Sequence, residues 1–324
     1  MKILITGAAG MIGRKLTARL VADGHLGGRK VTGLVLHDIA APEAPATGIP
    51  VTAVAGDLAA PGAAGALVAQ RPDVVFHLAG VVSGEAEANF ELGYQVNLDG
   101  TRQLFEAIRA AGFVPRVVFT SSLAVFGAPF PEVIPDEFHL TPLTSYGTQK
   151  MMAEALLADY SRREFFDGIG LRLPTICVRP GAPNKAASGF FSGIIREPLA
   201  GQRAVLPVPR EVIHTHASPR SAVGFLLHAA VLDTARVGPR RNLTMPGVAV
   251  SVAGMIAALG RVGGAAAVAR IDERPDAVIG TIVAGWPTRF DARRARDLGF
   301  VAETDFDEIV RAHVEDELGG RVAG

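Results

Sequence analysis

The sequence predicts an α/β fold with a doubly wound parallel sheet, and three observations support this prediction. Strand-like apolar runs alternate with helical patterns over about the first 180 residues. The first run, Lys2–Thr6, is apolar on both faces, as a central parallel strand should be. It leads directly into a glycine-rich turn at residues 7–13, which a helical pattern through Leu16 and Leu20 follows. Strand, glycines and helix in this order are typical of a nucleotide-binding sheet.

Further strand-like segments continue the alternation. They lie at residues 31–38, 50–57, 73–80, 116–122 and 170–177. Helical patterns separate them, one from about residue 94 to 111 and another that carries Tyr146 and Lys150. Because ligands of such sheets bind outside the carboxyl ends of the strands, we expect the functional residues there.

The pattern becomes less regular after residue 175. A helix is expected around residues 189–199 and another in the alanine-rich stretch 263–269. We therefore predict a Rossmann-type domain over residues 1–175 and a smaller C-terminal substrate-binding lobe over 176–324. The boundary is soft, and segments of the second part are allowed to return to the first. A proline-bearing loop at 127–144 is expected to form one wall of a substrate cleft.

The glycine-rich turn predicts a pyrophosphate site. Its three glycines, Gly7, Gly10 and Gly13, suit a sharp turn, close approach of backbone to phosphate, and packing of helix on strand. The helix that follows presents free N–H groups and a partial positive charge to an anion, and Met11 and Ile12 within the turn are expected to contact the cofactor.

Residues at the ends of the next strands complete a dinucleotide site. Asp38 ends the second strand, where a carboxylate would grip a ribose diol, and no Arg or Lys follows before Ala46. This favours NAD over NADP, although Asp38 could also be a simple loop or cap residue. Asp57 and Leu58 end the third strand, where they could meet the adenine. The small residues Ala79 and Gly80 end the fourth and would let the cofactor pass.

Tyr146 and Lys150 predict the chemistry. Residues four apart on a helix share one face, so the ammonium of Lys150 can lie beside the phenol and favour the phenolate. Ser122, at the end of a strand, could hold a substrate oxygen from the other side. Together these residues would move a proton to or from an alcohol or carbonyl. Taken alone, the spacing could equally mark a buried tyrosine followed by a solvent-facing lysine; the nucleotide-site context favours the catalytic interpretation.

Composition excludes several classes. The formal net charge is zero and the pI about 7.1, so neither a nucleic acid nor an anionic membrane is an expected partner. No apolar segment reaches transmembrane length, and no cleavage pattern follows the N-terminal apolar run. The single cysteine, Cys177, cannot form an internal disulfide, which favours a reducing cytoplasm. An inert core cysteine is the preferred interpretation of this residue.

Two other chemistries have little support. His214 and His216 alternate as strand ligands of a metal would, but no acidic or cysteine residue accompanies them at ligand spacing, so no metal is expected. No Gly-x-Ser-x-Gly elbow is present, and no histidine is linked to Ser122 by spacing.

Taken as a set, these motifs resemble those of the extended short-chain dehydrogenases/reductases. The matching positions are Gly7, Gly10, Gly13, Asp57, Leu58, His77, Leu78, Ala79, Asn97, Ser122, Tyr146 and Lys150. Segments 83–85, 121–127, 172–181, 183–191 and 216–220 are more specifically similar to bacterial D-erythronate dehydrogenases. That narrower resemblance extends through the second lobe. It implies oxidation, with NAD, of the C2 hydroxyl of a four-carbon sugar acid.

The resemblance also assigns roles that spacing alone does not. Asn97 is expected to support Lys150 through a water or backbone group, and Pro174 and Thr175 to contact the cofactor. For the substrate and its carboxylate, the candidates are Ser83, Ser122, Tyr146, Arg179, Asn184, Lys185 and Arg220.

Several departures from the superfamily weaken a nucleotide-sugar activity. Leu173–Thr175 replaces an aromatic-Phe-Asn stretch, and His216-Ala-Ser-Pro lacks an acid. Leu123 and Ala124 follow Ser122 where sugar dehydratases have an Asp-Glu pair, so no acid is available to expel water. Gln149 replaces the usual Ser or Thr before the lysine, a change not expected to affect the chemistry.

Alternatives remain open at this point. One is a nucleotide-sugar 4-epimerase that keeps its NAD tightly bound; another is a non-catalytic dinucleotide-binding sensor, which the intact Ser122, Tyr146 and Lys150 disfavour.

The resemblance implies a homodimer packed through the helix near Asn97 and the helix of Tyr146. The apolar positions expected to supply that interface are Leu104, Phe105, Ile108, Met151, Met152, Ala155, Leu156 and Tyr160.

Overall fold

A seven-stranded sheet of the predicted parallel type organises the N-terminal part of the computed structural model, which describes residues 1–181 and 187–323. Its strand order is β12-β8-β7-β6-β1-β4-β5. The strands, in chain order, are β1 (Lys2–Thr6), β4 (Gly33–Asp38), β5 (Val51–Ala55), β6 (Val74–His77), β7 (Arg116–Ser122), β8 (Asp167–Leu173) and β12 (Asn242–Thr244). The order reverses beside β1, which places a topological switch point at the carboxyl ends of β1 and β6.

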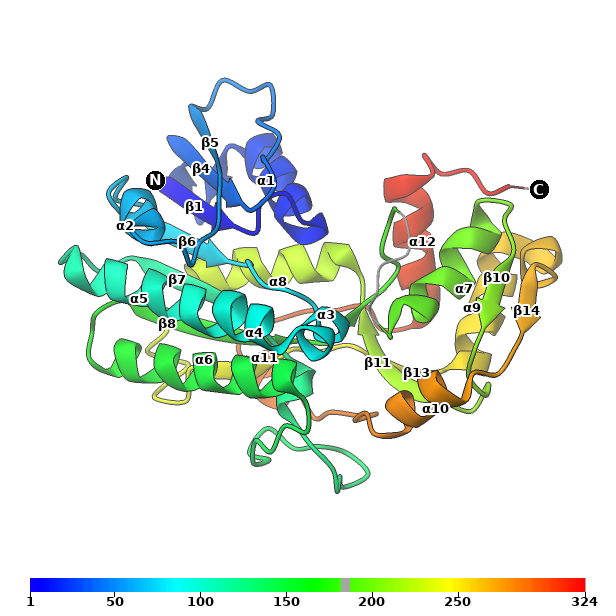
Figure 1. Ribbon diagram of the computed structural model, residues 1–324. Helices are drawn as coiled ribbons and strands as arrows, with labels where there is room; N and C mark the ends of the chain where they lie inside the picture. The colour runs from blue at the N-terminus through cyan, green and yellow to red at the C-terminus, as the bar shows by residue number, and fades with distance from the viewer. Residues whose placement is uncertain (182–186, 324) are drawn as a thin grey trace. The chain divides into compact units, whose positions relative to one another are not determined.

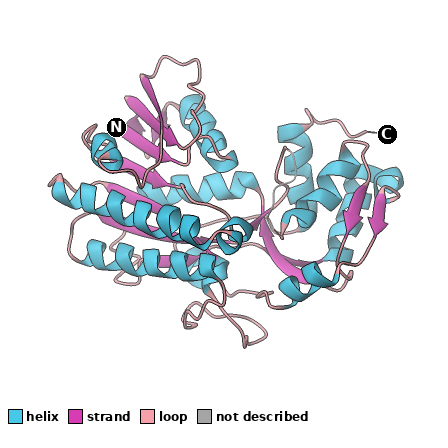
Figure 2. Cartoon of the chain, in the orientation of Figure 1, coloured by secondary structure: helices cyan, strands magenta, loops and turns pink. Residues whose placement is uncertain are grey.

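Helices cover this sheet on both faces (Figures 1 and 2). On one face lie α2 (Ala63–Val68), α5 (Thr101–Ala110) and α6 (Ser145–Arg162); α1 (Met11–Asp23) lies on the other. The first face is closed by a core to which Leu4, Val75 and Phe119 contribute from the strands and Phe105 and Leu157 from the helices. The central strands are buried on both faces, as the sequence predicted for β1, and the apolar stripes of the helices pack on them.

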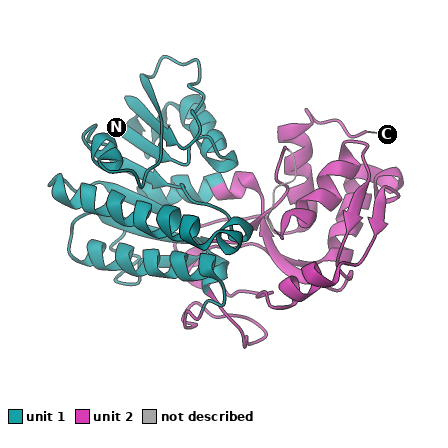
Figure 3. Ribbon diagram, in the orientation of Figure 1, with its two compact units in different colours: residues 1–125, 142–172, 223–244 teal, residues 126–141, 173–222, 245–324 magenta. Residues whose placement is uncertain are grey.

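The chain divides into two compact units (Figure 3). Unit 1 comprises residues 1–125, 142–172 and 223–244, and unit 2 comprises 126–141, 173–222 and 245–324. The division near residue 173 is close to the expected boundary at 175. Two segments lie on the other side of it: the proline-bearing loop belongs to unit 2, and residues 223–244, which include β12, belong to unit 1.

Unit 2 has its own apolar core and shorter strands. Its elements are β9 (Thr175–Ile176), α7 (Gly189–Leu199), β10 (Ala204–Leu206), β11 (Ile213–Ala217), β13 (Val248–Ser251), α9 (Val252–Val268), β14 (Ile271–Glu273), α10 (Ala277–Ala284), α11 (Arg293–Asp297) and α12 (Phe306–Glu317). The helix α8 (Pro219–Val231) begins in unit 2 and ends in unit 1. Phe191, Ile195, Met255 and Ile309 are among the core residues of unit 2.

Several element boundaries differ from the expected ones. The strand expected at 170–177 is two strands, because Pro174 has no N–H to continue the ladder, and β9 pairs with β11 in another sheet. The helix expected from residue 94 begins as a π-helix, η1 (Tyr94–Gly100), before α5. Short elements that no pattern indicated are β2 (His25–Leu26), β3 (Arg29–Lys30), α3 (Ser83–Ala88), α4 (Phe90–Gly93) and the 3₁₀ turn η2 (Leu123–Val125).

The dimer prediction needs one correction. Leu104, Phe105 and Ile108 are fully buried in the core of unit 1, so they do not form an exposed apolar surface. On α6, Ala155 is exposed, and Met151, Met152, Leu156 and Tyr160 are half-buried. The expected surplus of apolar surface on the two helices is therefore smaller than the sequence indicated.

Candidate active site

The start of α6 places Tyr146 close to the strand end that carries Ser122. Thr144 caps the helix by accepting a hydrogen bond from the N–H of Gly147. A Cβ on Gly147 would lie 2.1 Å from the carbonyl oxygen of Ala124, two residues after Ser122. Only glycine therefore allows this close contact. The hydroxyl oxygen of Ser122 accepts from the N–H of Ala124 at 3.1 Å, which leaves its hydrogen to donate to another oxygen.

Lys150 lies one turn further along α6 and is only 4% exposed. Its ammonium donates to the carbonyl oxygen of Thr120 at 2.9 Å and lies 5.8 Å from the ring centre of Tyr146. Burial lowers the pKa of Lys150 to about 8, and the nearby carboxylate of Glu154 opposes this shift. Lys150 thus still carries its positive charge at pH 7, where that charge favours the phenolate of Tyr146.

Asn97 is fully buried in the middle of the π-helix η1. Its amide is paired with the backbone of Val81: Oδ1 accepts from the N–H at 2.9 Å, and Nδ2 donates to the carbonyl at 3.3 Å. A Cβ added to Gly80 would lie 2.9 Å from Oδ1 of Asn97 and 3.4 Å from Nζ of Lys150. The side chains of Asn97 and Lys150 therefore both lie near Gly80 and leave no room for a side chain there.

A buried chain of hydrogen bonds links the π-helix to the first strand. Thr101 donates to the carbonyl of Asn97 at 2.8 Å, so its oxygen accepts from Nε2 of His77, also at 2.8 Å. Nδ1 of His77 then accepts from the hydroxyl of Thr6 at 2.7 Å. Burial lowers the pKa of His77 to about 3, with the charge of Lys150 adding to the effect, so the ring is neutral. Sequence patterns did not identify this network, since each residue resembles an ordinary core polar residue.

The glycine-rich turn fits a dinucleotide phosphate. Gly7 has φ +77°, and a Cβ there would lie 2.7 Å from the backbone nitrogen of Ala79. A Cβ on Gly13 would lie 2.2 Å from the carbonyl oxygen of Gly7. The helix α1 begins after Gly10 without a side-chain cap, so its first N–H groups are available to an anion. These residues would hold the pyrophosphate of a dinucleotide.

Asp38 closes this turn. One carboxylate oxygen accepts from the N–H of Ala9 at 2.9 Å, and the neighbouring backbone bond runs from the N–H of Ala8 to the carbonyl of His37 at 3.0 Å. The other oxygen of Asp38 is 3.4 Å from the N–H of Ala40. Asp38 therefore stands at the carboxyl end of β4 beside the glycine-rich turn, where a ribose-binding acid belongs.

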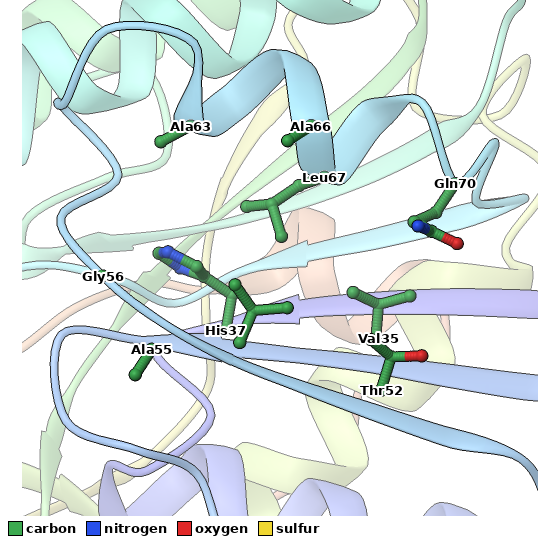
Figure 4. A pocket seen from close by; sticks show the side chains of 10 residues that line it. Val35, His37, Thr52, Ala55, Gly56, Ala63, Ala66, Leu67 and Gln70 are labelled. Atoms are coloured by element: carbon green, nitrogen blue, oxygen red, sulfur yellow. The ribbon is translucent and has the colours of Figure 1, made fainter.

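An apolar cavity of about 240 Å³ lies between the β4–β5 edge of the sheet and α2 (Figure 4). Val35, Val54 and Leu67 line it, and the ring of His37 points into it. Asp57, at the end of the next strand, accepts from the N–H of Ala59 at 2.8 Å and from the amide of Gln95 at 2.9 Å. Asp57 thus links β5 to η1, and Leu58 beside it is buried.

The other candidates of unit 1 lie at the ends of its strands. Leu78 and Ala79 follow β6 and are half-buried. Ser83 is the first residue of α3 and is half-buried.

In unit 2, the two expected substrate cations that the structure describes, Arg179 and Arg220, both have partners. The guanidinium of Arg179 donates to the carbonyl of Ile176 at 3.0 Å and to the hydroxyl of Ser188 at 2.8 Å. Arg220 pairs with Glu315 at 2.8 Å and Asp316 at 2.5 Å. Asn184 and Lys185 lie outside the described residues. Thr175 bonds through its hydroxyl to Nε2 of His214 at 2.7 Å, and Pro174 precedes it.

The two histidines of β11 belong to the core of unit 2. The rings of His214 and His216 pack against Phe191, and burial lowers the pKa of His214 to about 4. Within residues 1–181 and 187–323, no group of three or more His, Cys, Asp or Glu residues is placed to hold a metal ion. Cys177 is buried, and burial raises the pKa of its thiol to about 12, as expected of an inert core cysteine.

The fold and this site define a class of protein. A strand, a glycine-rich turn and an uncapped helix, together with a buried lysine one turn from a tyrosine, form the apparatus of a dinucleotide-dependent oxidoreductase. The chain belongs to the NAD dependent epimerase/dehydratase family, whose model matches residues 3–217. It is an NAD-dependent oxidoreductase of the extended short-chain dehydrogenase/reductase type. No helix among the described residues is both long and apolar enough to span a bilayer.

Relatives match the chain over nearly its whole length. It is 48% identical to a D-erythronate dehydrogenase of Cupriavidus necator, over 98% of each chain. It is 40% identical to one of Haemophilus influenzae, over 98% of this chain and all of the other. A solved structure described as a nucleoside-diphosphate-sugar epimerase from Agrobacterium tumefaciens is 62% identical, with a TM-score of 0.98 over 100% of this chain and 96% of the other.

Lys150→Met should stabilise the apoprotein at pH 7. The folded state holds the Lys150 proton less tightly (pKa about 8) than the unfolded state (ordinary value 10.5), so below pH 8 the wild type carries the full cost of the buried charge. That cost is of the order of 3 kcal/mol. It should shrink as the pH rises from 8 to 10.5. Urea unfolding of both proteins at pH 7 and pH 10 measures it; a variant less stable at pH 7 would contradict the buried charge.

Asp38→Asn should weaken the discrimination between NAD and NADP. Asparagine can still accept from Ala9, so the turn is kept while the charge that repels a 2′-phosphate is removed. We expect the wild type to prefer NAD, and the preference to fall by about 1–3 kcal/mol in the variant. Steady-state kcat/KM for both cofactors provides the measurement, with Asp38→Ala as the control that also loses the turn contact. A wild type that prefers NADP would refute this role of Asp38.

Proposed function

We propose that the protein oxidises the C2 hydroxyl of D-erythronate, or of a closely related tetronate, with NAD to give the 2-oxo acid. The observation that carries the proposal is the similarity to two D-erythronate dehydrogenases, which extends through both units. A similarity confined to the nucleotide-binding unit would support only the cofactor.

The chain's own residues supply the proton chemistry. Tyr146, as phenolate, takes the hydroxyl proton of the substrate, and the charge of Lys150 stabilises that phenolate. Ser122 donates a hydrogen bond to the substrate oxygen as it becomes a carbonyl. NAD, when bound, supplies the hydride acceptor. Because Lys150 is held by the carbonyl of Thr120, its charge is fixed in place before the substrate arrives.

The carboxylate of the substrate needs charge-assisted hydrogen bonds, since so small a molecule gains little from apolar burial. Oxidation at C2 places the carboxylate next to the reacting carbon. We assign it to the segment from Arg179 to Lys185, with Ser83 as a neutral donor. Arg220 is the remaining candidate cation, and in this structure it pairs with Glu315 and Asp316.

A nucleotide-sugar epimerase that retains its NAD is the second candidate, favoured by the description of the Agrobacterium tumefaciens structure. The two activities differ in where the hydride goes. An epimerase returns it to the sugar, so no reduced cofactor accumulates, whereas a dehydrogenase releases NADH.

The proposal extends to assembly and location. The proposed assembly is a homodimer packed through α5 and α6, and Ala155 is an exposed residue of α6. The reducing cytoplasm is the proposed location, since the single cysteine is buried and unpaired.

The decisive experiment measures NADH formation against a panel of four-carbon sugar acids, the corresponding neutral polyols and UDP-sugars. We expect turnover with D-erythronate or a close tetronate, and little with the polyols, which have no carboxylate to bind. Tyr146→Phe should bind NAD normally and lose about 10²-fold or more in kcat. Interconversion of UDP-sugars without NADH, with inert tetronates, would replace this proposal by the epimerase.

A further inference from the structure

Gln149 directly precedes Lys150 on α6, and the structure gives it more than a packing role. Its side chain is fully buried, and its Oε1 accepts from Nδ2 of Asn97 at 2.8 Å. Sequence comparison with the superfamily suggested that this position does not affect the chemistry. The hydrogen bond to Asn97 is a contact that this comparison did not foresee.

The direction of this hydrogen bond is fixed by the backbone. The N–H of Val81 can only donate, so Oδ1 of Asn97 must face it and Nδ2 must face Gln149. Gln149 is the acceptor that makes this orientation complete. Serine or threonine at the same place on the helix has a shorter side chain and reaches less far from the α6 backbone.

The surrounding chain is adapted to the glutamine. A Cβ on Gly93, at the end of α4, would lie 2.7 Å from Nε2 of Gln149, so the glycine leaves room for the amide. In the described part of the chain, Nε2 has no hydrogen-bond partner. Burying an amide whose N–H donor is unused costs free energy. The hydrogen bond that Gln149 accepts from Asn97 is therefore the favourable polar contact of its side chain.

The contact between Gln149 and Asn97 involves the π-helix η1. A π-helical turn is less regular than an α-helix and often occurs at functional sites, and Asn97 lies in the middle of one. Thr101 binds the backbone carbonyl of Asn97, and Gln149 binds its side chain. The asparagine is therefore held from two sides, next to Gly80 and the ammonium of Lys150.

We propose that Gln149 is a positioning residue. It orients the amide of Asn97 and, through it, the backbone of Val81, which follows Gly80 near the buried ammonium of Lys150. This inference deepens the proposed oxidoreductase function and rests on it for any measurement of rate.

Gln149→Met tests the proposal, because methionine has a similar volume and no acceptor of comparable strength. We expect kcat to fall about tenfold while KM for NAD stays within about twofold. In an Asn97→Ala background the same change should cost less than about twofold, since the residue acts through Asn97. Ser161→Ala is the matched control: Ser161 is buried on the same helix and bonds to Leu157 and Gly168 away from the site.

A second measurement needs no substrate. In the protein without substrate, amide hydrogen exchange at Val81 should rise in Gln149→Met and not in Ser161→Ala, because only the first change removes a bond that holds the Asn97 amide, whose oxygen accepts from Val81. Unchanged exchange at Val81, or an equal kcat loss with and without Asn97, would overturn the proposal. If the wild type oxidises no tetronate, the proposed function fails while the exchange result still decides the role of Gln149.

Discussion

An ammonium group that is almost completely buried needs an oxygen ligand from the protein, and Lys150 finds it in the carbonyl of Thr120. This one bond ties α6 to β7, the strand whose last residue is Ser122. Gly147 allows a second close contact of α6. Because it has no side chain, the helix can approach the backbone at Ala124. The phenol of Tyr146, the proposed base, and the hydroxyl of Ser122 are thus placed by the packing that buries the lysine.

A group of buried polar residues supports the positions of Asn97 and Lys150. Neutral His77 joins Thr6 of the first strand to Thr101, which in turn binds the carbonyl of Asn97. Its pKa, lowered to about 3, keeps a second positive charge away from Lys150 throughout the physiological range. Further along α6, Glu154 makes a second set of contacts with the sheet. It accepts from Ser121 at 2.6 Å and pairs with Arg172 at 2.7 Å. Each of these groups has its partner, so the network is rigid and specific.

Much of the fold could be predicted from the sequence, because continuous apolar runs mark buried strands and a 3.6-residue apolar period marks helices that pack on a core. β1, the end of β7 and α7 lie where those patterns placed them. The π-helix could not be predicted, since a π-helical turn changes the hydrogen-bond partner without changing the apolar pattern. The apolar stripe of α5 was assigned to a dimer surface, although Leu104, Phe105 and Ile108 fill the core of unit 1. Gln149 was passed over because a long-range contact with Asn97 leaves no trace in local spacing.

The charge state of Lys150 is the central claim, and it can be observed directly. Nuclear magnetic resonance of selectively labelled lysine, with Lys150→Met to assign the signal, gives the titration of this one ammonium in the apoprotein. The four other lysines of the chain serve as internal references. A midpoint near pH 8 is predicted for Lys150. A midpoint near 10.5 would mean that the ammonium is solvated, and would contradict a buried charge fixed beside Tyr146.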